Sequence, residues 1–232
     1  MKSYQAYLMT LEQSLESEKM IIAKQSSNST SDFKLPPAGS FMARLYRIID
    51  IGTQTTEWMG KKKMQRKIIA MFELHGEDND GQPLQTAEGK PLIVSKRYTL
   101  SLDEKATLRK DLEAWRGKAF TQEELDGFNL EVLLGKCCMV NITHSSYEGK
   151  EYANISGISQ VPSALKKLGE PVGVNELMIF TLDPFDQAKF EKLSEGMQGV
   201  IKKSAEYRNT FEPNSAPVSS VSSELIDDDI PF

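Results

Sequence analysis

Basic and aromatic residues are concentrated in a few stretches of the sequence that also have the composition of β-strands. Cations can pair with the phosphates of a nucleic acid, and flat rings can stack on its bases, each stacked base contributing about 1–3 kcal/mol. A surface that binds a single nucleic-acid strand needs both kinds of side chain. The residues predicted to form such a surface are Arg44, Tyr46, Arg47, Trp58, Lys61, Lys62, Lys63, Arg66, Lys67, Lys96, Arg97, Tyr98, Tyr147, Lys150 and Tyr152.

Other interpretations of these residues stay open at this point. A lysine run at a hairpin tip, such as the one that begins at Lys61, is commonly no more than a solvated turn. Tyr98 and Tyr152 can equally be core rings, because alternate positions of a strand face inward. Trp115 is expected in the core, since it falls at the end of an apolar helical stripe.

Residues suited to catalysis or to metal binding are few. The chain has two histidines, and neither lies in a recognisable acid–base or nucleophile arrangement. Cys137 and Cys138 are adjacent, so on a strand they point to opposite faces, which does not suit a shared metal ion. We therefore expect a binding protein and not an enzyme, with no cofactor and no metal. Two cysteines so poorly placed to cross-link the fold also fit a reducing cytosol.

The net charge of −5 is unevenly distributed. Residues 41–70 contain seven basic side chains against Asp50 and Glu57, which makes that stretch +5. Four of the negative charges fall in the last nine residues, at Glu224 and in an aspartate run that ends at Asp229. A basic segment inside the fold and an acidic segment at the end suit a nucleic-acid binder. No apolar run of about 18 residues is present and no secretory signal is recognisable, so neither a membrane partner nor export is expected.

The pattern of apolar residues predicts a mainly β fold with a helix inserted after the third strand. Strands are predicted over 41–51, 64–74, 92–101, 137–143 and 151–161, and a helix over 102–115. A hairpin turn at 58–61 follows a polar extension of the first strand, and a turn at 145–149 joins the last two strands. A short second helix begins at Thr121 with capping-box spacing. Small β-barrels of other kinds are compatible with this order, but the single helix after the third strand favours the five-stranded OB-type β-barrel. OB barrels bind single strands on strands two and three and on the loops joining strands one–two and four–five.

The chain is predicted to divide into four segments, of which one is the barrel and three flank it. Residues 1–32 form an N-terminal helical extension and linker, and residues 33–162 form the OB domain. Residues 163–212 add a short strand over 176–181 and helices from 186 onward. Residues 213–232 form a flexible linker and an acidic tail, because their Pro/Ser-rich composition cannot build a core. The apolar stripe of the first segment suits a docked helix, a loosely ordered extension or a dimerising helix, and the oligomeric state stays open.

The last residues carry the most specific motif. After a suitable tether the chain reads Asp227, Asp228, Asp229, Ile230, Pro231 and Phe232. This segment resembles the C-terminal tip of bacterial single-stranded DNA-binding proteins. The resemblance implies docking to replication or recombination proteins such as a polymerase, helicase or recombinase. A partner pocket would hold the Phe232 ring while basic residues meet the aspartates.

The body of the chain resembles a family of phage-encoded single-stranded DNA-binding proteins. The resemblance covers roughly residues 20–160 and leaves residues 1–19 outside. It is carried by Phe-Lys-Leu-Pro-Pro-Ala-Gly at 33–39, Lys-Arg-Tyr-Thr-Leu-Ser at 96–101, Leu-Glu-Ala-Trp-Arg-Gly at 112–117 and Tyr-Ala-Asn-Ile at 152–155. It implies an OB fold, sequence-nonspecific binding of single-stranded DNA, and a role in phage replication, recombination or repair in the bacterial host cytoplasm. The alternatives are an OB-fold protein-interaction adaptor and a recombination mediator or annealing protein.

Overall fold

A computed structural model describes residues 34–58 and 60–212. The predictions for the N-terminal helix, the C-terminal linker and the acidic tip lie outside these residues. Within them the protein is mainly β, as predicted. The five expected strands are β1 (Gly39–Trp58), β2 (Lys61–His75), β3 (Ile93–Thr99), β4 (Cys137–Tyr147) and β5 (Lys150–Ser159). The extension of the first strand and the hairpin after it are confirmed, since β1 ends at Trp58 and β2 begins at Lys61. The turn predicted over 145–149 is shorter, because β4 continues to Tyr147 and β5 begins at Lys150. The second strand also begins earlier than predicted.

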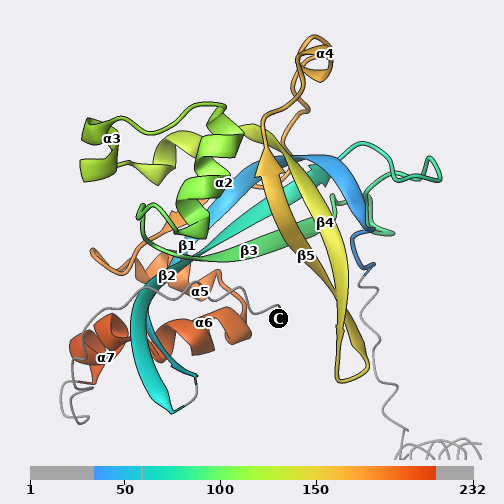
Figure 1. Ribbon diagram of the computed structural model, residues 1–232. Helices are drawn as coiled ribbons and strands as arrows, with labels where there is room; N and C mark the ends of the chain where they lie inside the picture. Colours follow the sequence, from blue (N-terminus) through green and yellow to red (C-terminus); the bar gives the residue numbers. More distant parts are fainter. Residues whose placement is uncertain (1–33, 59, 213–232) are drawn as a thin grey trace, which may run out of the picture. The chain divides into compact units, whose positions relative to one another are not determined.

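The strands form one sheet in the order β3-β2-β1-β4-β5, with each pair of neighbours antiparallel. A sixth strand, β6 (Met178–Phe180), pairs in parallel with β1. Hydrogen bonds do not close the sheet, but the two edge strands, β3 and β5, come close together, and α2 (Thr107–Arg116) contacts both (Figure 1).

Two hairpins project beyond the part of the sheet that has more than two strands. β1 pairs with β4 only over residues 39–44 and with β6 only over 47–49, so beyond these its sole strand partner is β2. We call residues 53–58 and 61–66 the basic arm. β4 pairs with β1 only as far as residue 142, and residues 143–147 and 150–154 form the second arm. Both arms extend toward the bottom of Figure 1.

The main core lies inside the curved sheet, beneath α2. Leu108, Leu112 and Trp115 are buried on one face of this helix, and the Trp115 indole donates to the Cys137 carbonyl over 3.0 Å. The prediction that Trp115 is a core residue is therefore confirmed. The helix begins at Thr107 and not at residue 102, because Ser101 and Asp103 bond to each other and hold the preceding residues as a turn. The predicted capping box is present at the start of α3 (Gln122–Asp126), and a 3-10 helix, η1 (Leu130–Leu133), leads into β4.

A second core covers the opposite face of β1 and β2. After α4 (Ser163–Lys166), the chain supplies β6, α5 (Gln187–Glu191), α6 (Glu195–Lys202) and α7 (Ala205–Phe211). Phe180, Phe190 and Ile201 from this segment pack on Ile49 and Ile69 of the sheet. A bulge in β1 near Tyr46 shifts the alternation of its side chains by one position. Leu45 and Ile48 therefore both face the main core, and Ile49 faces the second core. The predicted strand near 176–181 and the helices after 186 are confirmed, and no helix in the described ranges is long and apolar enough to cross a membrane.

Candidate nucleic-acid interface

The basic arm exposes cations on both of its faces. Trp58 pairs with Lys61, Glu57 with Lys62 and Thr56 with Lys63 across the two strands. Because side chains alternate along a strand, Lys61 and Lys63 lie on one face and Lys62 on the other. Lys61 and Lys62 are exposed and Lys63 is half-buried. An arm with cations on both faces can follow a phosphate backbone that crosses its tip.

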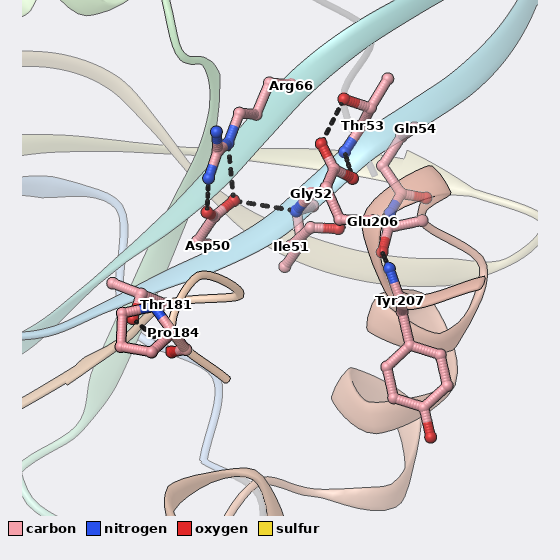
Figure 2. A network of polar contacts seen from close by, with 11 residues as sticks. Asp50, Ile51, Gly52, Thr53, Gln54, Arg66, Thr181, Pro184, Glu206 and Tyr207 are labelled. Carbon is pink, nitrogen blue, oxygen red and sulfur yellow. Dashed lines mark hydrogen bonds and ion pairs between the residues drawn. The ribbon is translucent and has the colours of Figure 1, made fainter. Parts of the chain in front are cut away.

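The base of the basic arm is held by an ion pair. The Arg66 guanidinium contacts Asp50 over 2.5 Å, and the same carboxylate accepts the Gly52 amide over 2.9 Å (Figure 2). The hydrogen bond with Asp50 raises the pKa of Arg66 further above its ordinary value. Arg66 keeps 45% of its side chain exposed, so it can still meet an anion.

The C-terminal helices also contact the base of this arm. Glu206 of α7 accepts two hydrogen bonds of 2.7 Å from Thr53, one from its backbone amide and one from its hydroxyl. The Gln54 amide donates to the Val200 carbonyl of α6 over 3.1 Å. Burial opposes the charged form of Glu206, but the bonds from Thr53 outweigh it and leave the pKa of this carboxyl lowered. The arm is therefore attached to the helices by a charged contact and not only by packing.

The second arm has a different chemistry. Tyr147 is 64% exposed and pairs with the exposed Lys150 at the tip, while Tyr152 is half-buried. Glu148 and Glu151 are exposed beside them. This arm offers a ring for stacking but carries more acidic than basic side chains. Of the predicted cations, the basic arm thus carries Lys61, Lys62, Lys63 and Arg66, and the second arm carries Lys150 beside the exposed Tyr147.

Several predicted interface residues of β1 and β3 lie inside the fold instead. Tyr46 is 3% exposed, and the Arg47 guanidinium lies 5.4 Å from the centre of its ring. Tyr98 is buried in the main core and donates to Asp111 over 2.8 Å, and the same carboxylate pairs with Lys96 over 2.9 Å. The core interpretation of Tyr98 thus matches its position, and a base could stack on this ring only after repacking.

Arg44, Arg97 and Lys67 were also predicted in the interface, and each has a different environment. Arg44 forms an ion pair of 2.7 Å with the buried Glu73. Arg97 is exposed on the face of β3 opposite to Lys96 and Tyr98. Lys67 is half-buried and pairs with Thr99 of β3, below the arm. Arg97 and Lys67 therefore lie on the sheet and not at the tip of an arm.

Glu73 is a buried carboxylate that the sequence analysis did not single out. It accepts bonds from the Val174 amide over 3.1 Å and from the Asn175 amide over 2.7 Å, in addition to its contact with Arg44. Burial alone would raise its pKa, yet the bonds from Asn175 and Arg44 leave the pKa lowered. The sequence did contain a signal that could have identified Glu73, because it is an acidic residue inside the apolar run 68–74. Its role is to attach the C-terminal segment to the sheet.

Two exposed lysines were also missed. Lys202 and Lys203 lie at the end of α6, a short way from the Val200 carbonyl that Gln54 contacts. They add positive charge near the base of the basic arm. Nothing in the sequence pattern connects them with the arm, because the contact depends on how the helices pack.

The cysteines and histidines take structural positions. Cys138 is fully buried and burial raises the pKa of its thiol, while Cys137 is half-buried. His75 lies 3.2 Å from Glu73, and His144 lies 2.8 Å from the Pro36 carbonyl. Among the residues that the structure describes, no group of three His, Cys, Asp or Glu side chains is arranged to hold a metal ion.

Comparison with known proteins identifies no relative: no protein-family model matches the chain, and none of the curated proteins does.

Proposed function

We propose that the chain is a sequence-nonspecific single-stranded DNA-binding protein that coats and protects DNA during replication or recombination, in a phage or its bacterial host. It binds without catalysing a reaction. The observation that carries the proposal is the basic arm, whose exposed Lys61 and Lys62 extend beyond the body of the sheet with Lys63 and Arg66 behind them.

The fold proposed for this activity is an OB-type barrel. Its support is the strand order β3-β2-β1-β4-β5, the helix α2 between β3 and β4, and the approach of β3 to β5. Read as a ring, this is the neighbour relation of a five-stranded Greek-key barrel that is open between its third and fifth strands. The basic arm then takes the place of the loop between strands one and two. The second arm takes that of the loop between strands four and five, and these are the two loops that grip single strands in OB folds.

Phosphate contacts supply most of the affinity in this proposal. Each cation that neutralises a phosphate releases a counterion, so binding weakens as salt is added. A single strand whose bases are unstacked can also place a base on an exposed ring, which duplex DNA cannot do. Together these contacts favour single strands of any sequence over duplexes.

The acidic segment Asp227–Phe232 is proposed to recruit replication or recombination proteins. The three aspartates of this segment and Glu224 carry four negative charges, which can also compete with DNA for the lysines of the basic arm. Partner binding to the tip would then remove this competitor. A shortened variant that ends at Ser223 is therefore expected to bind DNA at least as tightly as the full chain.

The test is fluorescence anisotropy of labelled oligo-dT and of a matched duplex, titrated with the protein across a salt series. Salt-sensitive binding to oligo-dT with much weaker binding to the duplex is expected. If neither the full chain nor the variant ending at Ser223 binds oligo-dT at low salt, the proposal is wrong. The sheet would then serve as a protein-interaction module. Acceleration of pairing between complementary strands would instead identify an annealing protein.

A further inference from the structure

The contact between Glu206 and Thr53 joins two parts of the chain that are 153 residues apart in sequence. It lies at Gly52, where the pairing of β1 with β2 shifts register and the backbone has φ of +71°. A Cβ atom at Gly52 would lie 2.5 Å from the Ser204 Cβ and 2.6 Å from the Glu206 carboxylate. The start of α7 therefore fits against the backbone of β1 where the basic arm begins (Figure 2).

This attachment restrains the direction of the arm. A two-stranded ribbon is marginally stable by itself, and its twist and bend are easily changed. Glu206 binds both the amide and the hydroxyl of one residue, which fixes the backbone at Thr53 as well as its side chain. Gln54 adds a bond to α6 at the next position.

We infer that Glu206 is a positioning residue for DNA binding: it sets the angle at which the basic arm meets the strand, although its own charge repels phosphate. The inference rests on the proposed function. The inference extends the proposed function, because it assigns the C-terminal helices a part in DNA affinity although the DNA-binding surface is on the basic arm.

The sign of the effect distinguishes this role from simple electrostatics. Glu206 contributes a negative charge near Arg66, so long-range electrostatics predicts that its removal raises affinity for DNA. Positioning predicts the opposite for Glu206→Ala, because both bonds to Thr53 are lost. Glu206→Gln removes the charge but keeps the shape: its oxygen can accept the Thr53 amide and its amide group can donate to the hydroxyl.

The experiment is oligo-dT binding by the full-length E206A, E206Q and E195A variants, with thermal unfolding as a check on folding. Glu195 is an exposed acid at the start of α6 and serves as the charge-matched control. E206A is expected to bind about tenfold more weakly than the wild type, the change that about 1.4 kcal/mol makes in an equilibrium constant. E206Q and E195A should bind within about twofold of the wild type. Equal or higher affinity of E206A, or equal loss in E206A and E206Q, overturns the inference.

A measurement without DNA separates this inference from the proposed function. In E206A, amide hydrogen exchange of the basic arm should become faster, while that of the second arm stays unchanged. If the wild type does not bind DNA, the proposed function fails, and the exchange result still decides whether Glu206 holds the arm. Should E206A not fold, Thr53→Val removes only the hydroxyl contact and is expected to give the same changes to a smaller degree. Unchanged exchange and affinity in that variant, beside an unfolded E206A, would assign Glu206 to overall stability and contradict the inference.

Discussion

The two arms are built in the same way and differ in what holds them and in what they present. Each continues a pair of antiparallel strands beyond the body of the sheet. The basic arm concentrates lysines at its tip and is attached at its base to the C-terminal helices through Glu206 and Gln54. The second arm exposes Tyr147 and mixed charges, and among the described residues no hydrogen bond or ion pair joins it to α5, α6 or α7.

The difference follows from charge. Adjacent lysines repel one another, so a ribbon that carries them is less stable than one with mixed charges. The carboxylates of Asp50 and Glu206 lie at the base of the basic arm, where they offset part of this repulsion without covering its tip. The second arm carries mixed charges, with Glu148 and Glu151 beside Lys150, so it has less repulsion to offset. The surface that we propose for phosphate binding is therefore attached at its base to a distant part of the chain.

The largest expected difference is in the free energy of unfolding, when a glycine at the base of the basic arm or in the turn of the second arm is replaced by alanine. Gly52→Ala places a methyl group against Ser204 and strains a backbone with φ of +71°, so the free energy of unfolding should fall by about 3 kcal/mol. Gly149 also has positive φ, but no atom lies within 4 Å of a Cβ there, and Gly149→Ala should cost only about 1 kcal/mol. Chemical denaturation measures both. Equal losses would mean that the basic arm is no more firmly attached than the second arm.

The second prediction concerns the charge at the tip of the basic arm. Lys61→Ala with Lys62→Ala should remove two phosphate contacts and lower the salt slope of oligo-dT binding by about 1.4, at about 0.7 per contact. At 0.1 M salt this corresponds to roughly 25-fold weaker binding. Lys166→Ala with Lys167→Ala is the matched control, because these adjacent lysines are also exposed but lie at the end of α4, which is at the opposite end of Figure 1. Equal slopes for the two double variants would make Lys61 and Lys62 ordinary turn residues.

The order of the strands and the position of α2 could be predicted, because both follow from local sequence patterns. The β-branched runs, the glycine that ends α2 and the capping box at Thr121 each reflect short-range constraints. The polar extension of β1 could be predicted only from the hairpin turn that follows it. The extra length of β4 could not be predicted, because its outer half is polar and owes its strand conformation to a single partner. Such ribbon segments lack the apolar alternation that identifies a half-buried strand.

The candidate site was predictable only where exposure follows from charge. Lys61 and Lys62 are exposed as a hairpin-tip lysine run suggests. Lys96 and Tyr98 were predicted in the interface, but the alternation of β3 turns both inward to Asp111, and only the partner strand decides which face is inner. The role of Glu206 depends on a contact between distant segments, and no local pattern encodes it.

A third prediction tests whether the second arm supplies a stacking ring. Tyr147→Ala should lower oligo-dT affinity by about 1 kcal/mol and leave the salt slope unchanged, since stacking releases no counterions. Tyr147→Phe keeps the ring and should bind as the wild type does. In the wild type, DNA is expected to quench the fluorescence of Trp58, the last residue of β1. Trp58→Ala is expected to lower the affinity for oligo-dT by an amount on the order of 1–3 kcal/mol. If Trp58→Ala weakens binding and Tyr147→Ala does not, stacking belongs to the basic arm alone.

The smallest expected effect is a dependence on pH that only the basic arm shows. The pKa of Glu206 is lowered in the folded protein, so its contribution to holding the arm is complete above the ordinary glutamate pKa of about 4.3. The contribution is lost as the pH falls below that value through the lowered pKa, because protonation then weakens the bonds from Thr53. Hydrogen exchange, corrected for its intrinsic pH dependence, should therefore show the basic arm losing protection in acid before the second arm does. Asp50 lies on the same base and also faces Arg66, so E206Q is the reference that isolates Glu206. If E206Q loses protection in acid as much as the wild type does, protonation of Glu206 is not the cause, and the bond to α7 is not the main attachment of the arm.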